Sequence, residues 1–491
     1  MKRFLASLLV VTAAVLAACA TQPGDAPMPA NAVVSRPGAN GPFIGTKGDL
    51  VAPEPVPGAW WKLYDDERLD ALVERALEAN TDLRIAAANI RKAQAGYDVA
   101  ASAKEPSTSI GAGVNYGRLS AEEQLHPGKP FPNKFTYGIG LGVSYQLDLF
   151  GQIARSIDAA GADVGAAVAA RDAVRVTVAA ETTRAYLEVC ATGREIGVAQ
   201  RLLGLQARST ALTRTLAEHG RATTQDTDRS IVQEQQVKAT LPGLEAQRQV
   251  AIHRLAVLTG ETPADFSEAV ETCVQEPGLE RALPVGDGAA LLRRRPDVRR
   301  AEFEVQGAWA RIGVVKADLY PKVVLGASLG SAGALSHAFE DDTFKFSVGP
   351  LISWEFPNRT RTQARIRGAD ADFDASLARF DGVVLGALKE TESALEVYAR
   401  DRERRDILDE ARERARRAAD DSHRLFAAGR TGFLPALDAD RTLASVEQGI
   451  AAADSKLAAD QVNLFLALGG GWQQADDAAA ASTDATRVAA H

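Results

Sequence analysis

The chain of 491 residues is poor in aromatic residues, cysteine and histidine, and it carries no excess of positive charge. Aromatic residues make up 6%, there are three cysteines and six histidines, and the formal net charge is -8. Nucleic-acid-binding proteins usually show a basic footprint, so this balance gives no support for that class. The histidines lack the spacing to cysteines or carboxylates that a metal site needs, so no metal is predicted.

Signatures of catalysis are also missing. No Ser/His/Asp or Cys/His constellation is visible. Gly138, Gly140 and Gly142 superficially resemble a phosphate-binding loop, but they lie within an alternating strand pattern and not at a strand-to-helix turn. The sequence therefore predicts no enzyme, and no cofactor apart from a covalent lipid.

That lipid is predicted by the N-terminus. Lys2 and Arg3 precede the apolar run Phe4–Ala18, which is typical of a secretory signal and is too short for a spanning helix. The run ends in Leu-Ala-Ala-Cys, which matches the bacterial lipobox and predicts cleavage before Cys19 and lipid on that cysteine. An ordinary signal peptide with an incidental cysteine is the alternative. Ala20, in place of an Asp, favours export to the outer membrane.

Two segments near the ends are rich in small residues. Residues 19–58 are rich in Pro, Gly and Ala and are predicted to form an extended, lipidated tether, and the tail 473–491 is predicted to be disordered. Cys190 and Cys273 remain in an oxidising compartment. The sequence leaves two alternatives: the two cysteines form a disulfide, or they are separate buried thiols.

The longest pattern is helical. Residues 152–260 carry no strand signal, are rich in helix formers and are broken only around Gly220, so we expect two antiparallel helices that meet there. At about 1.5 Å per residue, the first arm alone would span about 100 Å. The second arm has the a/d spacing of a coiled-coil seam at Val237, Leu241, Leu244, Arg248, Ala251, Leu255 and Leu258. Pro242 within this arm predicts a kink.

The same hairpin recurs 209 residues later. The turn returns at Gly429, and a second seam contains Val446, Ile450, Ala453, Leu457, Asp460, Leu464 and Ala467. Asp460 is the one polar break in that seam. The chain is thus predicted to be one architecture built twice. Two hairpins this long and thin are unsuited to the core of a globular enzyme.

A two-faced strand pattern precedes each hairpin. From Phe135 to Leu147, large apolar residues alternate with Gly, Ser, Thr and Gln, over a length that can cross a bilayer at a tilt. A shorter partner covers residues 109–116, and the second copy carries a strand over 344–356. Pro350 in that strand calls for a bulge or an unpaired position.

Four strands per chain are too few for a membrane barrel. Open sheet edges are not tolerated in hydrocarbon, and the smallest membrane barrels have about eight strands, so we expect the chain to oligomerise. A dimer, trimer or tetramer would give eight, twelve or sixteen strands. The glycines at 138, 140 and 142 favour a wider barrel with an open lumen.

The predicted fold is an α+β membrane protein, with a long periplasmic α-helical coiled-coil barrel and a transmembrane β-barrel shared between protomers. A helix over 69–105, capped by Asp66 and ended by Pro106, opens the first repeat. The predicted order is a signal peptide (1–18), the tether (19–58), repeat 1 (59–260, with a β-hairpin at 107–148 and a helical hairpin at 152–260), a linker (261–288), repeat 2 (289–472, with a β-hairpin at 322–356 and a helical hairpin at 361–469) and the tail (473–491).

Several features together resemble one family. They are the lipobox, the Trp-Trp-x-x-Tyr-x-Asp opening at Trp60, the Asp-Leu-Phe-Gly at Asp148, the duplicated organisation and the Leu-x-x-Leu-x-Gly-like end of each arm. The chain resembles the outer-membrane factor family of TolC- and OprM-type, NodT-like efflux lipoproteins. The resemblance implies a homotrimer with a twelve-stranded barrel in outer-membrane lipid and a helical tunnel through the periplasm. It also implies a passive exit duct for drugs or other small molecules, served by a periplasmic adaptor and an inner-membrane pump of the RND type.

In that family the periplasmic mouth is narrowed by acidic side chains near the hairpin tips. The pattern places an Asp six and nine residues after the second turn glycine, where this chain has Pro435 and Asp438, so only one acid matches. The alternative is that Asp438 is an ordinary solvated residue. The other expected gate residues are Asp226, Asp228, Arg221 and Arg430, and the expected adaptor contacts are Gly220, Gly429, Thr223 and Thr431.

Other functions stay open at this point. The duct could serve type I protein secretion or heavy-metal efflux instead of small-molecule efflux. In a different class, the chain could be a structural coiled-coil lipoprotein that stays in the periplasm. The transported substrate is not predicted, because the pump largely determines it.

Overall fold

The computed structural model describes residues 26–45, 50–118, 120, 128, 132–266, 269–279, 282–356 and 359–471. Cys19 and the tail 473–491 lie outside these residues. The contacts divide the chain into two compact units. One contains the strands with Asn89–Ala167 and Ala301–Phe380, and the other contains Pro29–Ala88, Val168–Arg300 and the chain from Asp381 onward. None of the described helices holds an apolar stretch long enough to cross a membrane.

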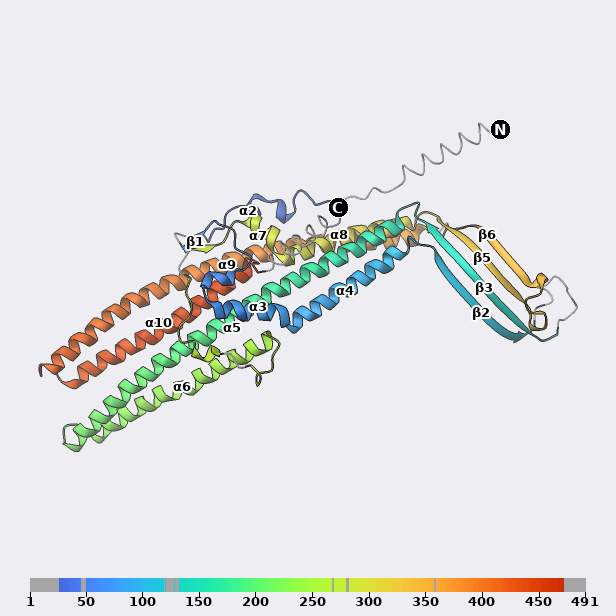
Figure 1. Cartoon of the computed structure of the whole chain (residues 1–491). Helices are drawn as coiled ribbons and strands as arrows, with labels where there is room; N and C mark the ends of the chain where they lie inside the picture. The colour runs from blue at the N-terminus through green and yellow to red at the C-terminus, as the bar shows by residue number, and fades with distance from the viewer. Residues whose placement is uncertain are drawn as a thin grey trace, which may run out of the picture. The chain divides into compact units, whose positions relative to one another are not determined.

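The first unit holds a four-stranded antiparallel sheet in the order β2-β3-β5-β6 (Figure 1). Its strands are β2 (Ser107–Gly117), β3 (Lys134–Leu147), β5 (Lys322–Ala334) and β6 (Phe344–Ser353). The predicted strands are confirmed, although β6 ends before the predicted boundary at Phe356. Pro350 lies opposite Leu325 in an unbroken register, so the bulge predicted as one option is absent. Within one chain, β6 is paired on one side only, and Pro350 has no amide hydrogen to donate to either side.

The register places residues of one kind on each face of the sheet. Residues opposite each other in paired strands share a face, so Leu141 lies with Ile110 and Leu329 on the apolar face. Gly140 lies with Gly111 and Gly330 on the other face. The two faces predicted for β3 thus continue into β2 and β5, although Val324 and Leu351 also lie on the face of the glycines.

Two long helical hairpins dominate the helical part of the chain. The first consists of α5 (Gln152–Glu218) and α6 (Thr224–Leu258), and the second of α9 (Arg359–Ala427) and α10 (Phe433–Ala467). Both turn at a glycine with positive φ, Gly220 at 71° and Gly429 at 67°, a conformation that glycine adopts without strain. The helix α6 continues through Pro242 without interruption, so the proline does not break it.

The single helix predicted over 69–105 is wrong, because it is two helices. The first, α3 (Glu67–Ala79), is capped by the Asp66 carboxylate as predicted, and the second is α4 (Thr81–Ser102). Asn80 separates them. Its side-chain oxygen accepts from the Asp82 amide at 2.9 Å, and its side-chain nitrogen donates to the Leu258 carbonyl at 3.1 Å. One residue therefore starts α4 and caps the end of α6.

The duplication extends to the bounds of the elements. A shift of 209 positions carries α6 onto α10, and a shift of 215 carries α4 onto α8 (Pro296–Ala317). The capping contact repeats as well, because these shifts carry Asn80 onto Arg295 and Leu258 onto Ala467, and Arg295 donates to the Ala467 carbonyl at 2.7 Å. The short α7 (Gly288–Arg294) precedes α8 as α3 precedes α4. The repeat is thus present in the structure as well as in the sequence.

The extended tether predicted over 19–58 is wrong for its described part. Residues 26–45 contain a short helix, α2 (Pro37–Asn40), and pack on α9. Asp381 accepts from the Val33 amide at 2.9 Å, and Glu392 accepts from the amides of Ile44 and Gly45 at 2.7 and 2.8 Å. Three backbone amides of this segment thus donate to carboxylates on α9, and its side chain Phe43 is buried. A two-residue strand, β1 (Val51–Ala52), then pairs with β4 (Leu283–Pro284).

The linker between the repeats is fixed to α5. Cys273 in the linker forms a disulfide with Cys190 of α5, with 4.7 Å between their Cα atoms. Of the two alternatives left by the sequence, the disulfide is therefore the observed one. The Arg248 guanidinium donates to the Cys273 carbonyl at 2.8 Å, which explains the polar residue in the first seam.

The main core lies where these helices meet the Trp-Trp opening. Trp60 is fully buried and stacks on Phe465 of α10, with 4.6 Å between the ring centroids. Tyr186 of α5 donates to Asp66 at 2.9 Å, so the residue that caps α3 also binds α5. The aromatic opening thus joins α3 to both hairpins.

Candidate functional site

The tips of the hairpins contain most of the predicted site residues. The chain reverses at each tip through equivalent hydrogen bonds: the Arg221 amide donates to the Leu216 carbonyl at 2.7 Å, and the Arg430 amide donates to the Leu425 carbonyl at 2.9 Å. These bonds close the ends of α5 and α9 around the left-handed glycines. Gly220 and Gly429 therefore determine the turn geometry.

The two tips differ in how the returning helix starts. In the first, the Thr223 hydroxyl accepts from the Asp226 amide at 3.1 Å, and the Asp226 carboxylate accepts from the Thr223 amide at 3.0 Å, which is a capping box. The Thr223 hydroxyl also donates to the Asp226 carboxylate at 2.7 Å, and this bond, together with the one from the Thr223 amide, lowers the pKa of Asp226. In the second tip, Gly432 is the N-cap and offers no side chain. Two predicted site residues, Thr223 and Asp226, thus have a local structural role.

The remaining predicted gate residues stay exposed within the chain. Asp228, Asp438, Arg221 and Arg430 are all solvent-exposed. Among the described residues of a single chain, neither arginine forms an ion pair with any of the predicted gate acids. The predicted pairing therefore does not occur within one subunit, and it would require a second copy. Thr431 is half-buried beside the second turn.

A groove of about 1010 Å³ lies between the first tip and α10. Arg221, Asp226 and Asp228 line it from the first hairpin, and Leu434 and Pro435 line it from the start of α10. The groove thus brings three of the predicted gate residues together. Asp438 is not among the lining residues.

Beside the groove, a buried polar cluster joins three helices. Gln206 of α5 donates to the Ser230 carbonyl of α6 at 3.2 Å and accepts from Arg441 of α10 at 3.2 Å. Thr210 lies 3.1 Å from the Ser230 hydroxyl. Sequence reasoning missed these residues, because each is a single polar residue whose partners come from other helices. The cluster links the first tip to the second hairpin.

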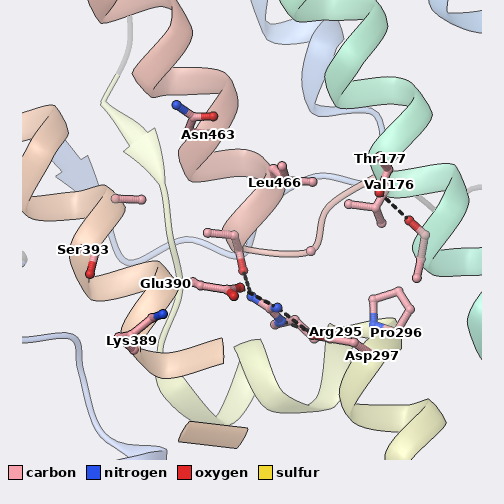
Figure 2. A pocket seen from close by; sticks show the side chains of 14 residues that line it. Val176, Thr177, Arg295, Pro296, Asp297, Lys389, Glu390, Ser393, Asn463 and Leu466 are labelled. Carbon is pink, nitrogen blue, oxygen red and sulfur yellow. Dashed lines mark hydrogen bonds and ion pairs between the residues drawn. The ribbon is translucent and has the colours of Figure 1, made fainter. Parts of the chain in front are cut away.

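A second cavity, of about 530 Å³, lies at the other end of α10 (Figure 2). Val176 of α5 and Leu466 of α10 line it, and Arg295 reaches in from the start of α8. Arg295 donates to Glu390 at 2.8 Å and to Asp297 at 2.6 Å. These partners hold the buried guanidinium in the ionised form and raise its pKa against the effect of burial. The Arg295 side chain is thus a cap on the end of α10 that is held by two counter-charges.

Further along α10, two aspartates form ion pairs, one with cations of neighbouring helices and one with a lysine of α10. Asp454 accepts from Arg405 of α9 at 3.0 Å and lies 2.8 Å from Arg194 of α5. Asp460, the polar break in the second seam, lies 3.5 Å from Lys456, which is also 2.9 Å from Asp401 of α9. From the sequence, Asp460 is recognisable as a polar residue at an apolar seam position. The sequence does not show that Asp401 shares its lysine, because Asp401 lies on another helix.

Comparison with known proteins gives a consistent result. A family model of outer membrane efflux proteins matches residues 72–261 and 289–470. The chain is 30% identical to the pyoverdine export outer membrane protein OpmQ of Pseudomonas aeruginosa, over 84% of this chain and 87% of that protein. It is 26% identical to nodulation protein T of Rhizobium leguminosarum bv. viciae, over 88% of each. A solved structure of the outer-membrane channel OprN is 33% identical, has a TM-score of 0.83 and covers 92% of this chain and all of that one.

Each repeat contributes one β-hairpin to the sheet and one helical hairpin, and the match to OprN identifies this fold as that of an outer-membrane channel. The chain belongs to the outer membrane efflux protein family. It is the outer-membrane component of an efflux system, and the predicted family, fold class and function are confirmed.

Proposed function

We propose that three copies of the chain form one passive duct, with a twelve-stranded barrel in the outer membrane and a helical tunnel in the periplasm. The observation that carries this proposal is the sheet, which has one apolar face and whose outer strands, β2 and β6, are each paired on one side only among the described residues. Unpaired strand edges are not tolerated in lipid, so neighbouring copies must supply the missing partners. The glycine-rich opposite face would then line a wet lumen.

The cargo of the duct is proposed to be small molecules that an inner-membrane pump of the RND type delivers through a periplasmic adaptor. The relative OpmQ is named for the export of pyoverdine, which supports small-molecule cargo. The turn residues Gly220, Gly429, Thr223 and Thr431 are the proposed adaptor contacts, because they form the ends of the hairpins. No reaction and no resident cofactor is part of this function.

The closed mouth is proposed to lie at the tips. Asp438 is exposed and free of ion pairs within the described part of one chain, so three copies around a narrow axis would present one sign of charge. A ring of acids attracts cations and sets the selectivity of a constriction. Arg221 and Arg430 are available to pair with the acids of a neighbouring subunit. Anchoring to lipid through Cys19 rests on the lipobox sequence alone.

Two measurements on the same detergent-purified sample test the assembly. Light scattering should give the mass of three chains, and reconstitution into planar bilayers should give discrete conductance steps. A monomer without conductance would support a structural coiled-coil lipoprotein instead. Labelling cells with radioactive palmitate, with Cys19→Ala as the control, tests the anchor separately.

A further inference from the structure

The charged residues of the four-stranded sheet are all lysines. Lys134 begins β3, Lys322 begins β5, and Lys345 is the second residue of β6. Among the strand residues, all of which the structure describes, there is no Asp, Glu or Arg. The helices α5 and α9, in contrast, carry charges of both signs. The sheet therefore has a single sign of charge.

These lysines lie on the face of the sheet that holds the glycines, which we call the glycine face. Lys345 is opposite Gly330, and Gly330 is opposite Gly140. Lys134 lies six positions before Gly140 on β3, so the alternation of side chains places it on the same face. Lysine is unfavourable on a surface that faces lipid but is compatible with a wet lumen. The distribution therefore agrees with a lumen on the glycine face.

Two of the lysines lack a counter-charge. Lys322 pairs with Asp318 at 3.1 Å. Lys134 and Lys345 are exposed, and neither forms an ion pair or a side-chain hydrogen bond with any described residue. Both belong to strands that begin where a hairpin loop ends, so they lie at the loop end of the sheet. Each chain thus contributes two uncompensated positive charges to that end of the glycine face.

The acids of the adjacent loop are held on the opposite side of the sheet. Tyr137 lies on the apolar face, where its hydroxyl accepts from the Phe339 amide at 2.8 Å and donates to the Thr343 hydroxyl at 3.1 Å. These bonds fix the loop 335–343 against the apolar face, and Tyr137 is buried beneath it. The loop contains three acidic residues, and none of them pairs with Lys345. The loop therefore leaves the positive charge of the glycine face in place.

We propose that Lys134 and Lys345 of three copies form a cationic collar inside the loop end of the barrel, which binds anionic groups of small molecules, such as carboxylate and phosphate, as they leave. This inference rests on the proposed trimeric barrel and adds the chemical class that its exit favours. Rings of lysine or arginine in a pore select anions. The sign is opposite to that of the proposed Asp438 ring, so neutralising the two rings should have opposite effects on selectivity.

The dimensions of the barrel allow the collar to act across the whole lumen. Twelve strands about 4.8 Å apart, with the usual tilt, enclose a radius of about 9–12 Å between backbones. The screening length at physiological ionic strength is about 8 Å. Lysine side chains that extend inward from the wall therefore influence ions near the axis. The passage stays open because the residues opposite Lys345 along the sheet are Gly330, Gly140 and Gly111.

The charge of the collar can be measured through the reactivity of a nearby cysteine in the full-length chain. Ser347→Cys and Thr136→Cys each place a thiol on the glycine face, two residues and about 7 Å beyond Lys345 and Lys134. Each variant is treated in proteoliposomes with an anionic thiosulfonate reagent that carries a sulfonate group, or with a cationic one that carries trimethylammonium. The two rates are followed by mass spectrometry. Cys190 and Cys273 do not compete, because they are bonded to each other.

The lysines should favour the anionic reagent. At low salt, a unit charge about 7 Å away in water changes each rate by about threefold in opposite directions, so Lys345→Gln should lower the anionic-to-cationic rate ratio at Ser347→Cys by about five- to tenfold. Lys134→Gln should do the same at Thr136→Cys. Lys345→Arg should keep the ratio, and so should Lys322→Gln, which removes a lysine from the other end of the sheet. In about 1 M salt, where the screening length is about 3 Å, the effect of Lys345→Gln should largely disappear.

Val348→Cys separates a failure of the collar from a failure of the barrel. Val348 lies on the apolar face next to Ser347, so lipid should protect its thiol from both reagents. Equal reactivity of Val348→Cys and Ser347→Cys would contradict the proposed barrel. A reactive Ser347→Cys and a protected Val348→Cys, with a rate ratio that Lys345→Gln leaves unchanged, would leave the barrel standing and overturn the collar.

Discussion

Asp460 of α10 and Asp401 of α9 share one cation across the contact between their helices. The Lys456 ammonium is 2.9 Å from Asp401 and 3.5 Å from Asp460, and the Asp460 side chain is only 7% exposed. Burial raises the pKa of Asp460 to about 6. The hydrogen bond from Lys456 lowers the pKa of Asp401, which Arg404 also favours. Asp460 is therefore the member of the pair that binds a proton in mild acid.

This pair predicts a pH-dependent stability. Between about pH 4 and pH 6, the folded chain binds more protons at Asp460 than the unfolded chain, where Asp titrates near its usual value of about 3.9. The contribution of Asp460 to the free energy of unfolding therefore falls as pH rises through this window. Asp460→Asn should raise the free energy of unfolding at neutral pH by about 1–3 kcal/mol and flatten the pH dependence. Thermal unfolding across the window measures both effects.

The control for this experiment is Asp420→Asn, since Asp420 is exposed on α9. That variant should keep the pH profile of the unchanged protein. If Asp460→Asn also keeps it, the buried carboxyl does not titrate in mild acid and the interpretation is wrong.

Asn80 and Arg295 cap equivalent helices in the two repeats, but we expect their removal to lower the free energy of unfolding by different amounts. Arg295→Ala removes the donor to the Ala467 carbonyl and leaves Asp297 and Glu390 without their cation, so we expect a loss of about 2–4 kcal/mol in the free energy of unfolding. Asn80→Ala removes only neutral hydrogen bonds and should cost about 1–2 kcal/mol. Lys389→Ala, an exposed residue of the same cavity, is the control and should be close to neutral. Chemical denaturation would contradict the ranking if Asn80→Ala cost more than Arg295→Ala.

The disulfide predicts a redox-dependent stability. Cys190 and Cys273 are separated by 83 residues. A disulfide that closes a loop of that size lowers the conformational entropy of the unfolded chain, which in the entropic account stabilises the folded protein by about 4 kcal/mol. Changing both cysteines to alanine should therefore lower the unfolding temperature by several degrees. Adding a reductant should lower it in the unchanged protein and have no effect on the double variant. If the two proteins have the same unfolding temperature with and without reductant, the disulfide does not stabilise the fold and the linker is held by its other contacts.

Much of this fold is readable from the sequence, since its determinants are local. Strands show a period of two, and Gly220 and Gly429 mark turns that require positive φ. The break at Asn80 is not readable, because helix-forming residues continue on both sides and the deciding partner, Leu258, is distant in sequence. The pairing of Cys190 with Cys273 is likewise determined by tertiary structure, since the two residues are 83 positions apart.

In the candidate site, too, the features set by neighbouring residues can be predicted from the sequence, and those that depend on distant residues cannot. The capping box from Thr223 to Asp226 is a local signature of four residues, yet the sequence interpretation gave Asp226 a role in the gate and Thr223 a role in adaptor contact. The cluster of Gln206, Ser230 and Arg441 was missed, as it unites three helices. In the proposed assembly, the residues of the gate would be determined by contacts between copies, which the structure of one chain does not contain.

The gate proposed at Asp438 predicts a change in single-channel conductance and selectivity. Asp438 is exposed, and within the described part of one chain it carries no side-chain ion pair, so three copies near the axis would repel one another and attract cations. Asp438→Ala should raise the single-channel conductance in planar bilayers and weaken cation selectivity, because it removes both the bulk and the charge of the ring. Asp420→Ala is the matched control, since it removes one exposed acid from the other helix of the same hairpin. Conductance and selectivity that stay the same in Asp438→Ala, or change equally in the control, would assign Asp438 to the solvated wall of the tunnel.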